Sequence, residues 1–112
     1  LVVCGDFNDS PGSPALRALC GSGVRALMDT RPAEPASTSP SLAPSGSPRA
    51  RRVTWTHYFA REDAFTRIDY ILVSRGMARE WRPEGTCILT SPDWGMASDH
   101  RPIVAEFETT ER

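Results

Sequence analysis

The segment FTRIDYILVS, residues 65–74, constrains the fold more than any other part of this 112-residue chain. Its apolar residues lie on both faces of an extended segment, which is the strongest indication of a β-strand in the sequence. Asp69 interrupts the segment between Ile68 and Tyr70, and a carboxylate among apolar neighbours is costly unless it has a partner. Arg67 is one candidate partner, because residues i and i+2 lie on the same face of a strand. We therefore expect a core strand that carries a partnered carboxylate.

Strands predominate in the rest of the chain. Four further segments have the apolar run or the alternation of a strand, namely 1–4 (LVVC), 52–59 (RVTWTHYF), 85–91 (GTCILTS) and 101–108 (RPIVAEFE). The first of these has consecutive apolar residues, which predict a strand buried on both faces. One clear helix is expected at 14–21, with Ser13 as its N-cap. Its inner face should hold Leu16, Leu19 and Cys20. This pattern predicts an α/β or α+β fold in which helices cover a sheet.

A proline- and serine-rich segment at 32–48 interrupts the pattern. It contains five prolines and five serines but only one charged residue and no aromatic residue, so it cannot bury enough apolar surface to offset its ordering entropy. We expect a disordered or loosely held surface loop rather than a linker between two domains. The basic run RARR at 49–52 should form a solvated patch, with contact to a phosphate-bearing substrate as the alternative.

The composition excludes some classes of partner. The net charge is -1 and the pI is near 6.1, so the chain has no global positive field that would bind nucleic acid by charge alone. No apolar run approaches the roughly 20 residues needed to span a membrane, and we expect no signal peptide, because the opening LVVC has neither a basic n-region nor an h-region. The sequence lacks an initiator Met and opens within an apolar run, which suggests a piece of a longer protein, so its localisation is undetermined. The three cysteines are too few and too scattered for a zinc site, and we expect them to be small buried side chains.

Polar side chains depart from the local pattern at three places, which are the end of the first strand, the interior of the core strand and the approach to the last strand: Asp6 and Asn8, Asp69, and Asp99 and His100. A carboxylate next to a histidine fixes its tautomer and raises its basicity. Other carboxylates are suited to a hard divalent cation such as Mg²⁺. Such a set can activate water and stabilise charge on a phosphorus centre, so these residues predict a hydrolytic site.

Several of these residues also have a simpler structural interpretation. Asp9, in the same turn, is expected as a turn or cap residue, and Asp6 alone could form an Asx turn. His100 could be a core histidine with satisfied hydrogen bonds, and Asp99 with His100 could end the loop through hydrogen bonds to the backbone. The spacing alone leaves both interpretations open.

Three motifs, taken together and in this order, resemble the C-terminal half of the endonuclease/exonuclease/phosphatase superfamily: GDFN (5–8), RIDYILVS (67–74) and SDHRPI (98–103). That group includes deoxyribonuclease I, the exonuclease III-type repair enzymes, inositol polyphosphate 5-phosphatases and sphingomyelinases. The resemblance implies a four-layer α/β sandwich of the deoxyribonuclease I-like type. The chain, residues 1–112, would be the C-terminal portion of that single domain, mostly strands with one or two short helices, and the N-terminal half would be missing.

The resemblance also implies a role for each polar residue. Asp6 would orient or deprotonate the attacking water, and Asn8 would hold the scissile phosphate and help to position Asp6. Asp69 would hydrogen-bond His100, which would bind or protonate the phosphoryl oxygen or act as the base. Asp99 would help to bind the metal ion, Mg²⁺ or Mn²⁺.

Two further residues are candidates for contact with the substrate. Trp55, in the sequence TWT, falls where many members of the family keep an aromatic residue near the substrate, and a core position is its alternative. Arg67 is the second candidate, and the role of partner to Asp69 is its alternative.

The expected function is divalent-metal-dependent hydrolysis of a phosphoester, as a phosphodiesterase, nuclease or phosphatase. The substrate class, nucleic acid or phospholipid and phosphoinositide, is open, and its specificity would lie in the segments 90–100 and 49–58. Because the family's first half supplies further metal and phosphate ligands, we expect the chain alone to be inactive and to expose the sheet face that the missing half covers. The alternatives are a non-catalytic binding or scaffold domain with the same fold, and an unrelated small α+β interaction module.

Overall fold

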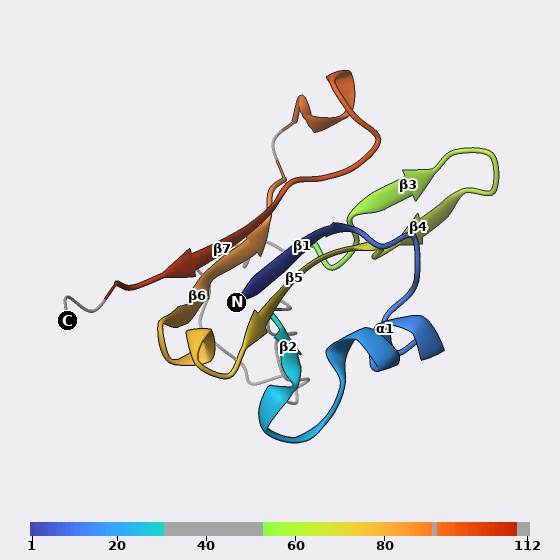
Figure 1. Cartoon of the computed structure of the whole chain (residues 1–112). Helices are drawn as coiled ribbons and strands as arrows, with labels where there is room; N and C mark the ends of the chain where they lie inside the picture. The colour runs from blue at the N-terminus through green and yellow to red at the C-terminus, as the bar shows by residue number, and fades with distance from the viewer. Residues whose placement is uncertain (31–52, 91, 110–112) are drawn as a thin grey trace, which may run out of the picture.

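The computed structural model describes residues 1–30, 53–90 and 92–109 (Figure 1). In this part of the chain the elements are β1 (Val2–Asp6), α1 (Pro14–Cys20), β2 (Leu27–Asp29), β3 (His57–Phe59), β4 (Ala64–Thr66), β5 (Asp69–Ser74), β6 (Trp81–Ile88) and β7 (Ile103–Phe107), with the short 3-10 helices η1 (Gly23–Arg25), η2 (Met77–Arg79) and η3 (Trp94–Met96). Strands predominate over one short α-helix, which confirms the expected α/β class. The segments 32–48 and 49–52, for which a loop and a basic patch are expected, lie outside the described residues.

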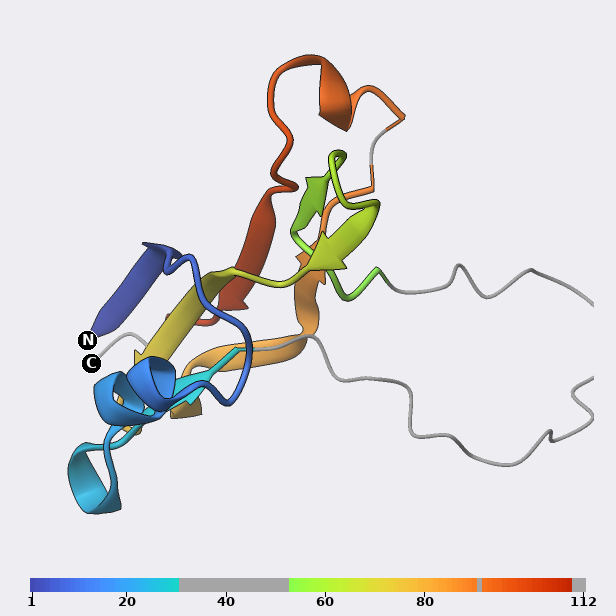
Figure 2. The same ribbon diagram turned by 90° about the vertical axis from the view of Figure 1, so that its right-hand side faces the viewer.

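β5 is the central strand of a three-stranded antiparallel sheet with the order β1-β5-β2. It is buried on both faces, since Tyr70, Leu72 and Val73 are each 2% exposed or less. α1 packs through Leu16 on the face that carries Tyr70 and Leu72. Figures 1 and 2 show α1 and the β6–β7 pair on opposite sides of β5. The apolar run found in the sequence is therefore the core of the described fold.

The strand expected at 65–74 is nevertheless two strands, β4 and β5, separated by Arg67 and Ile68. At this point the chain leaves the β3–β4 hairpin and enters the three-stranded sheet. The buried Thr56 stabilises the transition, because its Oγ1 accepts hydrogen bonds from the backbone N–H groups of Ile68 (3.1 Å) and Asp69 (3.2 Å). The sequence pattern misses this break because it contains neither glycine nor proline. Asp69 thus begins β5 instead of lying in the middle of a strand.

β1 is not buried on both faces, and that expectation is wrong. Among the described strands β1 pairs only with β5, so it forms an edge of the sheet. Val2 is 42% exposed and Cys4 is exposed as well. Cys87 is also exposed and Cys20 is half-buried, so the expectation of three buried cysteines fails too. A consecutive apolar run identifies the strand but cannot tell which neighbours cover it.

The helix forms as its capping residues predict. Ser13 Oγ accepts a hydrogen bond from the N–H of Leu16 at 3.1 Å, and Pro14 occupies the first helical position. Gly21 ends the helix with a φ of 65°, a conformation that glycine adopts without strain. Of the residues expected on the inner face of the helix, Leu16 is buried and Cys20 is half-buried. Leu19 is 42% exposed, because only a narrow face of the helix contacts the sheet.

The remaining strands form two antiparallel pairs, β3–β4 and β6–β7. The last strand has the predicted alternation, with Ile103, Ala105 and Phe107 half-buried between exposed neighbours. The strand expected at 52–59 is confined to β3, and β6 begins at Trp81 instead of residue 85. No helix within the described ranges is long and apolar enough to cross a membrane.

Candidate active site

The ends of β1 and β5 bring two carboxylates together. In the antiparallel pairing of these strands, Asp6 lies directly opposite Asp69. The backbone N–H of Asn8 donates to Asp6 Oδ1 at 2.8 Å, so Asp6 also forms the Asx turn that the sequence allowed. Asn8 has a φ of 51°, which places the chain in a tight turn directly after β1. The remaining oxygen of Asp6, Oδ2, lies 4.0 Å from His100 Nε2.

Backbone hydrogen bonds to β3 hold His100 at this place. His100 forms an isolated antiparallel bridge with His57. On either side of it, the N–H of Arg101 donates to the carbonyl of Thr56 (2.6 Å) and the N–H of Tyr58 donates to the carbonyl of Asp99 (3.3 Å). The approach to the last strand is thereby fixed against β3, whose hairpin with β4 leads into β5, so residues remote in sequence meet at one site.

A close contact between side chains joins His100 to Asp69. His100 Nδ1 lies 2.9 Å from Asp69 Oδ2. An ionised carboxylate can only accept a hydrogen bond, so Nδ1 carries the proton and Nε2 is directed away from Asp69. The candidate partner named for Asp69, Arg67, does not fill this place. The partnered carboxylate expected in the core strand is thus the orienting group of the histidine.

The surrounding carboxylates alter the acidity of this imidazole. The hydrogen bond that His100 donates to Asp69 raises the pKa of His100 above its usual value, partial burial opposes the rise, and the negative charges of Asp69, Asp6 and Asp99 add to it. His100 is therefore protonated up to a higher pH than a free histidine.

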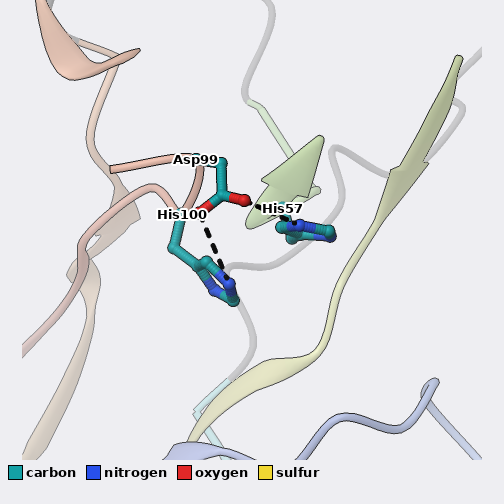
Figure 3. A group of neighbouring side chains, drawn as sticks. All are labelled: His57, Asp99 and His100. Atoms are coloured by element: carbon teal, nitrogen blue, oxygen red, sulfur yellow. Dashed lines mark ion pairs between the residues drawn. The ribbon is translucent and has the colours of Figure 1, made fainter. Parts of the chain in front are cut away.

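Asp99 lies on the outer side of His100. Its side chain is 71% exposed, and Oδ1 lies 3.9 Å from His100 Nε2 while Oδ2 lies 3.4 Å from His57 Nε2 (Figure 3). His57 is a neighbour that the sequence analysis treated only as part of a strand. Its signal in the sequence is that it is one of just two histidines in the chain.

Thr56 is a second residue that sequence reasoning missed. Its side chain is fully buried, and its hydroxyl oxygen holds the backbone N–H groups at the start of β5. It acts on the site only through the position of Asp69. An apparently outward-facing threonine in an alternating segment gives no sequence signal for such a role.

The two residues expected to contact the substrate each have partners of their own within the fold. Arg67 is 8% exposed, and its guanidinium makes two hydrogen bonds to Asp29, at 2.6 and 2.8 Å. It also lies over the ring of Tyr70. The positive charge of Arg67 is therefore paired with Asp29 inside the fold. The buried position of Arg67 does not support the expected contact with the substrate.

Trp55 belongs to an aromatic cluster beside the site. Its ring packs against Phe65 and Trp94, and the guanidinium of Arg101 lies over both tryptophan rings, 4.2 and 4.3 Å from their centres. The cluster connects the 90–100 segment to the β3–β4 hairpin.

Asp9, finally, has the turn role expected of it, since its Oδ1 accepts from the N–H of Ser10 at 2.9 Å.

The donor atoms of the site fit a divalent cation. Asp6, Asp69 and His100 offer ligand atoms within 4.8 Å of one another, and so do His57, Asp99 and His100. The carboxylate oxygens of Asp6 and Asp99 are the hard donors that Mg²⁺ or Mn²⁺ prefers. An open hollow of about 430 Å³ beside Asp6, Asp69 and His100 leaves room for a ligand.

Comparison with known families agrees with this geometry. The model of a family described as Endonuclease/Exonuclease/phosphatase matches residues 1–100. None of the curated proteins and none of the solved structures compared with the chain gives a match. The matched span contains every residue of the cluster around His100, and members of such a family are in general hydrolases of phosphoesters. The chain belongs to the endonuclease/exonuclease/phosphatase family.

Proposed function

We propose that this chain carries part of a divalent-metal-dependent phosphoester hydrolase site in which His100 and the acidic residues around it assist attack of water on phosphorus. The observation that supports the proposal most directly is the contact of 2.9 Å between His100 Nδ1 and Asp69, with Asp6 and Asp99 on the Nε2 side. An imidazole oriented by one carboxylate, with its other nitrogen left for a ligand, is an arrangement suited to proton transfer.

His100 is the proton-carrying group of the proposed site. Its Nδ1–H stays on the hydrogen bond to Asp69, and its Nε2–H is free to donate to a phosphoryl oxygen in the hollow. The raised pKa keeps this nitrogen protonated to a higher pH than in a free imidazole. His100 can thus stabilise the negative charge that develops on the phosphoryl oxygen.

Asp6 and Asn8 act on the attacking water and the phosphate. One oxygen of Asp6 is held by the N–H of Asn8 at 2.8 Å, which fixes the carboxylate and leaves the other oxygen to orient water or to accept its proton. The carboxamide of Asn8 follows in the same exposed turn and is proposed to donate to the phosphate.

Asp99 is proposed to help hold the metal ion, Mg²⁺ or Mn²⁺. Its carboxylate is exposed and lies beside His100, so it can take a hydrated cation that keeps several of its waters. Bound there, such an ion supplies positive charge that neutralises the phosphate and lowers the pKa of a coordinated water.

We further propose that the chain is the C-terminal portion of its domain and needs the other half for activity. The exposed edge strand β1 and the exposed apolar side chains Leu1, Val2 and Met28 support this, because a covering half would bury such a surface. The chain alone should then hydrolyse a generic phosphodiester at the background rate.

Hydrolysis of bis(p-nitrophenyl) phosphate tests both parts. With MgCl₂, the 112-residue chain should give the background rate, and a chain that carries both halves of the domain should give turnover that falls by about 10²- to 10⁴-fold in His100→Ala. Turnover by the 112-residue chain that disappears in His100→Ala would refute the need for a second half but support the hydrolase. A folded two-half chain that binds phosphoesters yet turns none over would identify a non-catalytic binding domain instead.

A further inference from the structure

The two histidines of the chain lie side by side on the surface of the site. His57 in β3 and His100 before β7 are joined by a backbone bridge, and their ring centres are 4.6 Å apart (Figure 3). The proposed hydrolytic reaction uses only His100. The position of His57 is therefore unexplained by that function.

The Nε2 atoms of both imidazoles face the carboxylate of Asp99. Nε2 of His57 lies 3.4 Å from Asp99 Oδ2, and Nε2 of His100 lies 3.9 Å from Asp99 Oδ1. These separations are long for hydrogen bonds. They are close to the distance of about 3.3 Å that separates two ligand atoms on a tetrahedral ion with metal–ligand bonds of about 2.0–2.1 Å. A small closure of the three side chains would bring them onto one ion.

The opposite nitrogens of both rings already have partners. Nδ1 of His100 donates to Asp69. Nδ1 of His57 lies 3.4 Å from the hydroxyl oxygen of Thr66, which can accept a hydrogen bond from it. With the proton on Nδ1, each ring presents the lone pair of Nε2 toward Asp99. Histidines that bind metals are held in this way, with the second ring nitrogen donating to a carboxylate or another oxygen.

We propose that His57, Asp99 and His100 form a binding site for a borderline divalent transition-metal ion such as Zn²⁺, with water in the open fourth position. Two imidazoles and one carboxylate are a ligand set suited to Zn²⁺ and unsuited to Mg²⁺, which prefers oxygen donors throughout. The 71% exposure of the Asp99 side chain gives the ion an entry path. This site shares Asp99 with the proposed magnesium or manganese position and differs from it in its two imidazole ligands.

A consequence follows that rests on the proposed function. Zn²⁺ on Nε2 of His100 removes the nitrogen that would donate to the phosphoryl oxygen and takes Asp99 away from the hard cation. Zinc binding at this site would therefore oppose hydrolysis. Binding itself does not depend on whether the chain is a hydrolase, so the two proposals fail separately.

Long-range ¹H–¹⁵N correlation spectra of the imidazoles provide the test, because the chain has only two histidines to assign. During titration of the 112-residue chain with ZnCl₂, the Nε2 resonances of His57 and His100 should both shift and reach their end point together at one ion per chain, while millimolar MgCl₂ leaves His57 unchanged. A shift at His100 alone, or at neither ring, overturns the proposal.

Variants separate this site from other zinc ligands of the chain. His57→Gln should weaken ZnCl₂ binding at least about tenfold by calorimetry, and Asp99→Asn should do the same, whereas Asp63→Asn, a carboxylate on the β3–β4 turn, should not. A chain with Cys4, Cys20 and Cys87 replaced by serine should bind with unchanged affinity. Loss of binding in the serine variant, or full affinity in His57→Gln, contradicts the proposal, and the spectra of the unaltered chain decide the matter if a variant fails to fold.

Discussion

Asp69 is the residue on which the candidate site depends most directly. It begins β5, it lies opposite Asp6 in the sheet, and its carboxylate fixes the tautomer of His100. Its own position depends on Thr56, whose buried hydroxyl holds the N–H of Asp69. The chemistry of the site is thus set by a short chain of contacts from a buried threonine through a carboxylate to an imidazole.

Replacing Asp69 by asparagine should lower the pKa of His100. The largest cause of the raised pKa is the hydrogen bond that His100 donates to this carboxylate. The pKa is elevated in the folded state, so the stabilisation from the pair is complete below the unfolded value of about 6.5 and is lost as the pH rises through the folded value. Asp69→Asn should therefore reduce stability more at pH 5.5 than at pH 9. NMR titration of His100 in metal-free buffer and urea unfolding at both pH values measure the two effects.

Asp63→Asn serves as the control for this prediction, since Asp63 bonds to the hydroxyl of Tyr58 on the exposed turn and is remote from His100. An unchanged pKa of His100 in Asp69→Asn would show that the contact of 2.9 Å does not govern the imidazole.

Replacing Thr56 by valine should destabilise the chain by about 1–3 kcal/mol, because two buried N–H groups lose their acceptor while the shape is kept. Thr56→Ser should restore most of the loss, since it retains the hydroxyl. Chemical unfolding monitored by tryptophan fluorescence measures the difference. Thr54→Val, at an exposed position in the same segment, is the matched control, and equal costs at positions 54 and 56 would contradict the proposed role.

At the scale of the elements, the link between β4 and β5 is where the β3–β4 hairpin meets the three-stranded sheet. Arg67 in this link makes its two hydrogen bonds to Asp29 at the end of β2, and the N–H of Phe7 after β1 donates to the carbonyl of Ile68 at 2.9 Å. The link is thereby tied to both edge strands of the three-stranded sheet. The geometry of the site at the start of β5 rests on these ties.

Asp29→Ala should destabilise the chain by about 1–3 kcal/mol, because it leaves the buried charge of Arg67 without its partner. The double variant Asp29→Ala with Arg67→Met should recover part of this loss, since the buried charge is then removed as well. Asp93→Ala, an exposed carboxylate at the start of η3, should have almost no effect. Urea unfolding of the four proteins provides the measurement, and a double variant no more stable than Asp29→Ala would argue against a buried unpaired charge.

At the scale of the whole molecule, the described fold leaves apolar surface at an open edge. β1 pairs on one side only among the described strands, and both Leu1 and Val2 are exposed. An open edge strand with apolar side chains is a template for pairing with another chain. The molecule therefore combines a well-ordered cluster of polar groups with a surface suited to association.

The chain should self-associate at micromolar concentrations, and Val2→Lys should shift the equilibrium toward monomer because a charged side chain on the edge opposes pairing. Val24→Lys is the matched control, since Val24 is 85% exposed but lies in η1 away from this edge. Sedimentation velocity over a range of concentrations measures the distribution. Equal behaviour of the two lysine variants would show that β1 is not the associating surface.

The sequence identified residues of the candidate site but not their arrangement in space. The predicted residues Asp6, Asp69, Asp99 and His100 do converge, because each lies at or just before the end of a strand, and polar groups at strand ends are conspicuous among apolar runs. Sequence spacing gave no signal for His57 and Thr56, since their roles come from pairing with segments far along the chain. It named Arg67 as a possible partner of Asp69, because the alternation of side chains in an unbroken strand would have put Arg67 on the same face as Asp69.

By itself, the sequence determined the strand-rich class, the helix with its N-cap, the core strand and the set of polar residues, because these follow from local periodicity and turn chemistry. Only the tertiary structure decided that the core strand breaks at Arg67, that β1 is an exposed edge, and that both histidines face Asp99. Burial and partnership depend on which strands become neighbours, and pairing across the chain is set by the free energy of the whole fold.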